Sequence, residues 1–128
     1  MIARLWSGET AAEDADRYVA YLRETGLAEY ASSDGFRQGL MLRRTRGDRA
    51  TFLLVTLWDS MESIEGFAGP HPERAVYYPK DEEFLLHKSK DVDHYEVVEE
   101  FGPQGSAILN PEGTEPAPRR PPPEPPRP

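Results

Sequence analysis

The sequence has no cysteine and only three histidines among its 128 residues. Without cysteine there can be no disulfide, no thiolate nucleophile and no thiolate metal site. The histidines are scattered, and no HExxH motif, glycine-rich phosphate loop or glycosidase-type pair of carboxylates is present. These absences count against zinc hydrolase, nucleotide-binding and glycosidase functions.

Long hydrophobic runs are also missing. Nowhere do about 18 apolar residues follow one another, and the opening MIARLWSGET has too short an apolar run for a signal peptide. The sequence therefore predicts a soluble, untargeted protein, and the lack of cysteine is compatible with a cytoplasmic location.

The formal charge is −8 at pH 7, with 23 acidic residues against 15 basic ones. Residues 102–128 hold three glutamates and three arginines, so the whole excess belongs to residues 1–101. An acidic domain repels phosphate backbones, and no basic stretch is interleaved with aromatic residues. A nucleic-acid partner is therefore not expected.

Ten of the thirteen prolines lie in residues 102–128. Such a segment has little apolar surface to bury, so it predicts a disordered tail that samples extended conformations. It is either a solvated appendage or a ligand for a proline-binding groove, for which PAPRRPPPEPP has the composition. The sequence thus predicts a folded domain over residues 1–101 and a proline-rich tail over 102–128.

The first third of the domain predicts a strand and then a helix. IARLW is a short apolar run that ends at Ser7-Gly8, which favours a strand. Thr10 and Glu13 have the spacing of a capping box. Apolar residues then recur with helical spacing as far as Gly26, at Ala15, Tyr18, Val19 and Leu22.

The remaining segments complete a repeat of this order. FRQGLMLRRT and ATFLLVTLW, joined at Gly47-Asp48, predict an antiparallel hairpin. A second capping box at Asp59 and Glu62 precedes a short helix with an apolar stripe at Met61, Ile64 and Ala68. KDEEFLLHK predicts a brief helix with acids in its first turn, and VDHYEVVEE alternates like a strand.

The predicted order is strand, helix, strand, strand, helix, strand. This βαββαβ order predicts an α+β ferredoxin-like sandwich, in which helices cover one face of a four-stranded antiparallel sheet. ATFLLVTLW is apolar at consecutive positions, so both of its faces need cover. A homodimer through the uncovered sheet faces would provide it.

These segments also carry a family resemblance. IARLW, LLVTLWDSMESIEGFAG, ERAVYYP and the closing HYEV resemble the antibiotic biosynthesis monooxygenase superfamily, the dimeric α+β barrels, over about residues 1–99. The resemblance implies a homodimer with a pocket in each subunit between the sheet and the helices. Some members oxidise phenolic polyketides without a cofactor, and others degrade haem.

For a cofactor-free oxygenase, the residues that could form the site are clustered around HPERAVYYPKDE. His71 and Tyr77 are the catalytic candidates, His71 as the base. The substrate-binding candidates are Trp58, Phe67, Arg74, Tyr78 and Phe84. Each has a structural alternative, such as core packing for Trp58 and Phe67 or simple solvation for His71.

The alternating residues of two segments cannot all face the pocket. Only one of Tyr77 and Tyr78 is expected to enter it, because consecutive residues of an extended segment point opposite ways. For the same reason one of His94 and Tyr95 faces inward, and His94 is expected at the dimer interface.

Haem-degrading members carry a tryptophan on the second helix and an iron-ligating histidine ten residues later. The matching positions here hold Phe67 and Tyr77, and His71 is the nearby alternative ligand. No cofactor and no metal are therefore expected, with haem as the alternative.

The leading hypothesis is a cofactor-independent monooxygenase that acts on an aromatic or polycyclic phenol. The first alternative is a haem-binding or haem-degrading monooxygenase. The second is a non-catalytic homodimer that binds a hydrophobic small molecule or docks a partner through its tail.

Deleting residues 103–128 should shift the melting temperature by less than about 2 °C, because the tail has little apolar surface to bury. Calorimetry of the full chain and the truncated chain measures this. A large decrease would instead mean that the tail docks on the domain, with Ile108 and Leu109 as its anchors.

Overall fold

The computed structural model describes residues 1–103, so the predicted tail lies outside the described residues except for its first two. The chain divides into two units, residues 1–97 and 98–128, and the fold and site described below belong to the first. Among the described helices, none is long and apolar enough to cross a membrane.

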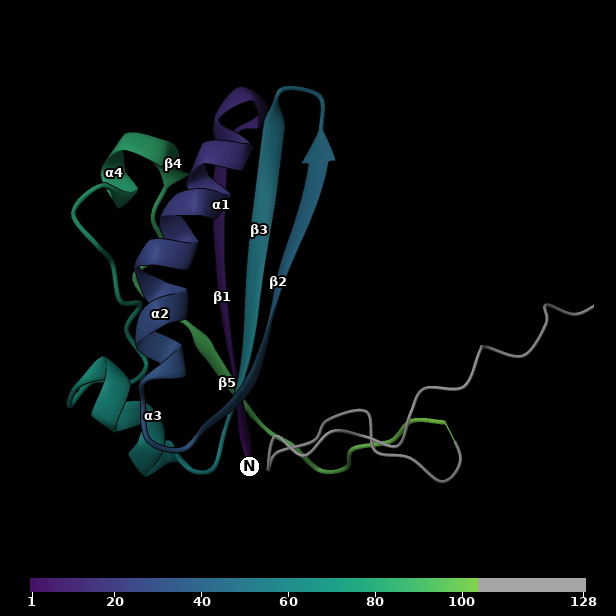
Figure 1. Ribbon diagram of the computed structural model, residues 1–128, viewed down its shortest axis with the longest axis vertical. Coiled ribbons are helices and arrows are strands. Elements are labelled where there is room, and N and C mark those ends of the chain that lie inside the picture. Colours follow the sequence, from purple (N-terminus) through teal and green to yellow (C-terminus); the bar gives the residue numbers. More distant parts are fainter. Residues whose placement is uncertain (104–128) are drawn as a thin grey trace, which may run out of the picture. The chain divides into compact units, whose positions relative to one another are not determined.

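The first unit contains an antiparallel sheet with the strand order β2-β3-β1-β4, and β5 also pairs with β1 (Figure 1). Its strands are β1 (Ile2–Ala11), β2 (Phe36–Arg46), β3 (Arg49–Trp58), β4 (Leu85–His87) and β5 (Asp93–Glu96). The short strands β4 and β5 pair with opposite ends of β1, so together they take the place of a fourth strand. This order confirms the predicted ferredoxin-like α+β fold.

The helices lie on one face of this sheet (Figure 1). They are the 3-10 turn η1 (Ala12–Asp14), α1 (Ala15–Glu24), α2 (Gly26–Ala31), α3 (Met61–Ala68) and α4 (Asp81–Phe84). The predicted apolar stripe of α1 is confirmed, because Ala15, Tyr18 and Leu22 are buried. Strand β4 was not predicted: the helix in KDEEFLLHK ends at Phe84, and the chain then extends along β1.

The prediction that the first strand ends at Ser7-Gly8 is wrong. Pairing of β1 with β3 continues without a break to Ala11, opposite Arg49. Gly8 lies inside the strand because the indole of Trp6 folds over it, and a Cβ atom there would lie 2.5 Å from the Trp6 ring. The longer strand makes Thr10 a buried β residue rather than a helix cap. Its hydroxyl donates to the Ala11 carbonyl.

Two other predicted helix boundaries also differ. Gly26 does not stop the helical segment but begins α2, after a break at Thr25. The cap of α3 is Ser60, whose Oγ accepts a hydrogen bond from the Ser63 amide at 3.2 Å. Asp59 forms an ion pair with Arg37 instead, because the helix begins later than the proposed capping box requires.

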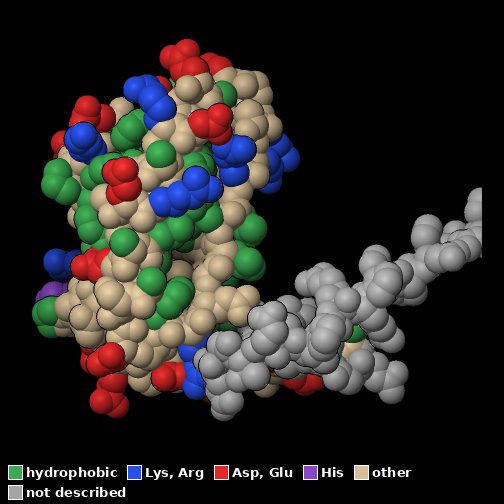
Figure 2. Space-filling model, in the orientation of Figure 1, with side chains coloured by type: hydrophobic (Ala, Val, Ile, Leu, Met, Phe, Trp, Pro, Cys, Tyr) green, Lys and Arg blue, Asp and Glu red, His purple; other side chains and the backbone are tan. Residues whose placement is uncertain are grey.

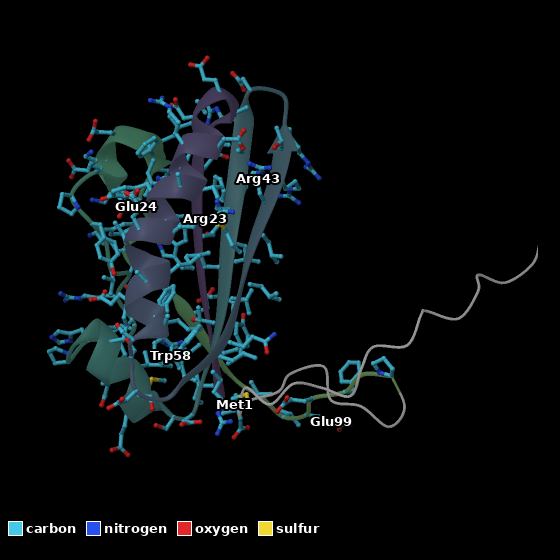
Figure 3. All side chains as sticks on the ribbon, in the orientation of Figure 1. Met1, Arg23, Glu24, Arg43, Trp58 and Glu99 are labelled. Atoms are coloured by element: carbon cyan, nitrogen blue, oxygen red, sulfur yellow. The ribbon has the colours of Figure 1, made fainter. Side chains whose placement is uncertain are left out.

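The hydrophobic core lies between the helices and the sheet and is rich in aromatic rings. Phe52 and Trp58 of β3, Tyr18 of α1 and Ile64 of α3 are fully buried. Figure 3 shows Trp58 at the end of its strand, beside the helices. The Tyr18 ring packs on Phe52 at 5.3 Å between centroids. In Figure 2 hydrophobic side chains are visible in the middle of this view, with charged side chains of both signs above and below them.

The opposite face of the sheet is apolar but has no helix over it. Alternate residues of β3 and their neighbours on β2 and β1 point to this face, as the pairing register requires. They are Leu5, Leu40, Leu42, Leu53, Val55 and Leu57, together with Tyr95 of β5. Leu40 and Tyr95 are 52% and 57% exposed. An open face with this many aliphatic side chains is typical of an interface.

We expect a second copy of the chain to cover this face, so the protein in solution should have about twice the 14.5 kDa chain mass. Light scattering measures the mass. Val55→Lys places a charge at the centre of the face and should give a monomer. Ser32→Lys adds the same charge at an exposed position and should leave the mass unchanged. A parent protein with the mass of one chain would contradict the expectation.

Candidate functional site

A cavity of about 20 Å³ lies between the sheet and the helices. Arg4 and Trp6 of β1 and Leu54 of β3 line it from the sheet. The helices and the connection before α4 close the other sides, through Tyr18, Leu22, Gly26, Tyr30, Val76, Tyr78 and Asp81. This volume holds about one water molecule. The walls combine aromatic rings with a small number of polar groups, which is typical of a small-molecule site.

Arg4 is the cationic residue of the cavity, and it is only 3% exposed. Its Nη1 donates to the Pro72 carbonyl and to Nε2 of His94 at 3.0 Å, and its Nη2 donates to the Arg74 carbonyl at 3.1 Å. Among residues 1–103 no carboxylate forms an ion pair with Arg4. Burial lowers the pKa of Arg4, and neighbouring Tyr30 acts in the opposite direction. Among the described residues the guanidinium is thus surrounded by neutral acceptors, and its Cζ lies 5.8 Å from the centroid of the Phe67 ring.

His94 faces Arg4 because the two residues are paired between β5 and β1. The expectation that His94 faces a dimer interface is therefore wrong: this register puts it on the helix-covered face and leaves Tyr95 on the open one. Burial, and then the charge of Arg4, lower the pKa of His94 below its usual 6.5. The imidazole is consequently neutral at pH 7 and accepts the hydrogen bond from Arg4.

Trp6 supplies a second donor on the sheet side of the cavity. Its Nε1 is buried and has no hydrogen-bond partner among the described residues. A buried donor without an acceptor costs about 1–3 kcal/mol, and such groups are rare in folded proteins. The indole is held in place by the edge of Tyr77, at 6.3 Å between ring centroids. Trp6 lines the cavity, and its N–H is a donor that still lacks an acceptor among the described residues.

Asp81 is the acidic residue of the cavity, and its oxygens already have partners. Its Oδ1 accepts from the Tyr18 hydroxyl at 3.0 Å, and its Oδ2 accepts from the Tyr78 amide at 2.6 Å. The Tyr78 hydroxyl in turn donates to Glu29 of α2. These bonds tie the connection before α4 to α1 and α2.

The buried tyrosines remain protonated at neutral pH. Burial raises the pKa of Tyr18, and the charge of Asp81 adds to this shift. Burial likewise raises the pKa of Tyr78, with the hydrogen bond to Glu29 in second place. For Tyr30, burial raises the pKa to about 12 although Arg4 opposes the shift. The three phenols are therefore neutral at pH 7, and the hydroxyls of Tyr18 and Tyr78 donate to Asp81 and Glu29.

Of the seven predicted site residues, Tyr78 borders the cavity directly. Three others lie in the aromatic cluster behind its walls. Trp58 is fully buried and donates from Nε1 to Thr56 at 2.9 Å. Phe67 lies 4.8 Å from Tyr30 and Phe84 lies 5.3 Å from Tyr18, both between ring centroids.

The structure does not bring the other three residues to the cavity. The His71 side chain is 62% exposed, with Glu73 at 3.7 Å. The Tyr77 hydroxyl donates to the Ser89 carbonyl at 2.5 Å, so it points to the loop between β4 and β5. Arg74 is exposed and contributes its backbone carbonyl to Arg4. Of the two consecutive tyrosines, Tyr78 is thus the one whose side chain reaches the cavity.

Sequence reasoning missed Arg4, Trp6, Tyr30 and Asp81. A signal for the first two was present in IARLW, because residues two apart on a strand share a face. An arginine that shares a strand face with a tryptophan indicates that a charged side chain enters the hydrophobic core. Tyr30 and Asp81 carried no comparable signal, since helix packing brings them to the cavity from distant segments.

A second, open hollow of about 670 Å³ lies on the surface. Its lining is mainly serines and acids from α2, α3 and the segment that follows α2, with Phe67 at one side. Among the described residues no group of histidines and acids has the arrangement of a metal site. We take the cavity beside Arg4 and Trp6 as the candidate site, because it combines aromatic walls with buried polar groups.

Comparison with known proteins gives a likeness of fold alone. Neither a family model nor a curated protein sequence matches the chain. Among solved structures the chain is similar to a mutant of MhuD with two manganese protoporphyrin IX bound per active site. The TM-score is 0.52 at 18% identity, over 80% of this chain and 100% of MhuD. The similarity supports the α+β fold described above and nothing beyond the fold.

This similarity corrects the expectation that no cofactor is involved, because a protein of similar fold holds metalloporphyrins. The residues described here do not fit a porphyrin as they stand. Ligand pockets of drug-like size have about 300–1,000 Å³, whereas this cavity has about 20 Å³. None of the three histidines lines it. A porphyrin would thus require both a displaced wall and a ligand atom other than histidine nitrogen.

The free energy of unfolding should fall as the pH rises above about 10. An unfolded tyrosine loses its proton near pH 10, whereas burial keeps Tyr30 protonated to about pH 12. Stability from this group is therefore complete below pH 10 and lost toward pH 12, on the order of 2–3 kcal/mol. Urea unfolding between pH 8 and about pH 11.5 measures the loss. Tyr30→Phe should reduce this loss of stability, because it removes the titrating hydroxyl.

Proposed function

We propose that the protein binds a small planar aromatic molecule between its helices and its sheet, as a monooxygenase-like protein with a phenolic substrate. The observation that carries the proposal is the cavity itself, which combines aromatic walls with inward-facing polar groups. A similar fold that holds a large planar ligand supports it. We further propose that the functional unit is a homodimer joined through the open sheet faces.

A ligand larger than water requires one wall of the cavity to move. Val76 and Tyr78 belong to the segment between α3 and α4, which has no helix or strand. Around Arg74 this segment pairs with residues 90–92 through backbone hydrogen bonds, whereas Tyr78 is held by the bond from its hydroxyl to Glu29 and the bond from its amide to Asp81. Displacing Tyr78 would open the cavity without disturbing the sheet.

The proposed chemistry is oxidation of an activated ring carbon beside a phenol. In an anthrone, one atom of O₂ becomes the new quinone carbonyl oxygen, and the other leaves as water with the two hydrogens of the methylene. The ring must first lose a proton, and Asp81 supplies a carboxylate at the cavity to receive it. The aromatic walls exclude water from the resulting anion.

A metalloporphyrin is the second candidate ligand. The observation that favours it is the similarity of fold to MhuD with manganese protoporphyrin IX. The small cavity volume and the positions of the histidines count against it. Hemin therefore belongs in the same set of experiments as the phenol.

Gly26→Leu tests the location of the site. A Cβ atom at Gly26 meets the rings of Tyr30 and Tyr78 at 3.8 Å, so the first carbon fits and the rest of the leucine enters the cavity. We expect this variant to lose binding of 1,8-dihydroxyanthrone, measured by quenching of tryptophan fluorescence, and to lose oxygen uptake above the buffer rate. Hemin binding, measured from its absorption spectrum, should be lost in parallel.

Gly66→Leu is the matched control, because no atom lies within 4 Å of its added Cβ and it lies outside the cavity. It should bind and react like the parent. Equal binding by both variants would place the site elsewhere. A parent protein that binds hemin but not the anthrone would favour the porphyrin, and one that binds neither would contradict the proposal.

A further inference from the structure

Arg4 carries a buried positive charge that no described carboxylate balances. Charged groups are rarely buried unless they are paired, because removal from water disfavours the ionised form. The three acceptors of Arg4 are two backbone carbonyls and the neutral ring of His94. They satisfy donors but supply no negative charge. A partner with such a charge is therefore missing from the described residues.

A second donor without a described partner belongs to a residue that lines the same cavity. Trp6 follows Arg4 by two residues on β1, so both side chains lie on the helix-covered face, and both line the cavity. The Trp6 Nε1 lacks any described acceptor. An anionic oxygen bound there would balance the charge of Arg4 and accept a hydrogen bond from the Trp6 N–H.

Asp81, the other charged residue of the cavity, lies on its helix side. Asp81 enters from α4, and both of its oxygens accept hydrogen bonds from tyrosines. The described residues give it no ion pair with Arg4. In the cavity each oxygen of the acidic residue thus already accepts one hydrogen bond, whereas the basic residue has no described counter-charge.

We propose that Arg4 and Trp6 form an anion-recognition site, so that the ligand is an aromatic anion whose phenolate or carboxylate oxygen pairs with the guanidinium and accepts from the indole Nε1. This deepens the proposed function and rests on it, since the aromatic part of the ligand lies in the same cavity. The pairing would hold a phenol in its ionised form, which is the electron-rich form that reacts with oxygen.

Arg4 also has a structural role, which the test must separate. Its bonds to the carbonyls of Pro72 and Arg74 attach the segment before α4 to the sheet. That role needs donors but no counter-charge, and it does not discriminate between ligands by charge. Charge selectivity is therefore the property that identifies recognition.

The experiment compares 2-naphthoate with 2-naphthamide, which have the same rings and differ in charge. Binding is followed at pH 7 by tryptophan fluorescence. We expect the parent to bind the naphthoate about tenfold more tightly or better, as a charge-assisted hydrogen bond should give. In Arg4→Gln the preference should fall to about one.

Three variants make the result specific. Arg43→Gln removes an exposed arginine that is paired with Asp16, and it should leave the preference unchanged. Arg4→Lys keeps the charge without the planar fork, so it should keep the preference at lower affinity. Trp6→Phe should weaken naphthoate binding more than naphthamide binding. Circular dichroism shows whether each variant is folded. If Arg4→Gln does not fold, Trp6→Phe tests the site, since it too should reduce the preference for the naphthoate.

The outcomes separate the two proposals. If the parent binds both probes equally, the anion site is wrong while the proposed aromatic-binding function stands. If Arg4→Gln keeps the preference, or Arg43→Gln loses it equally, Arg4 is not its source and the inference fails. If neither probe, nor the anthrone, nor hemin binds, the proposed function fails and the anion site fails with it.

Discussion

The antiparallel pairing of β1 with β3 is the constraint on which the fold and the site depend. Ten consecutive residues of β1 pair with β3 without a bulge, so the alternation of side chains is fixed along the whole strand. Arg4, Trp6 and Thr10 must then face the helices, and Leu5 must face the open side. A slip of one residue would place the charge of Arg4 on the apolar open face.

The alternation of side chains along β1 buries Arg4, which is energetically unfavourable but gives the cavity its cationic group. Burying Arg4 without an opposite charge is unfavourable, and the protein reduces that cost only partly, with carbonyl oxygens and a neutral imidazole. The same acceptors lie on the segment before α4 and on β5, so Arg4 holds together parts of the chain that are far apart in sequence. A site that recognises an anion needs this incomplete compensation, because a carboxylate already paired with Arg4 would compete with the ligand.

Two tyrosines hold one wall of the cavity through hydrogen bonds, and breaking these bonds would free that wall. Tyr18 of α1 donates to Asp81, and the hydroxyl of Tyr78 donates to Glu29 of α2. The Tyr78 amide also donates to Asp81. The sheet side, in contrast, is built from paired strands. If the cavity opens, it should open on the side of Val76 and Tyr78, where the chain has no regular hydrogen-bond ladder.

The sequence by itself determined the order of the elements, the hairpin, the helical stripe at Ala15, Tyr18 and Leu22, and hence the fold class, because these depend on local periodicity and turn residues. It misplaced the end of β1 and the caps of α1 and α3, because strand pairing and packing over Gly8 override local capping signals. Of the candidate site it supplied Tyr78 and the surrounding rings. Only the tertiary structure decided that Arg4 is buried without a carboxylate partner among the described residues and that Trp6, Tyr30 and Asp81 line the same cavity. Those relations join segments up to 77 residues apart, and no local pattern records which distant side chains will share a cavity.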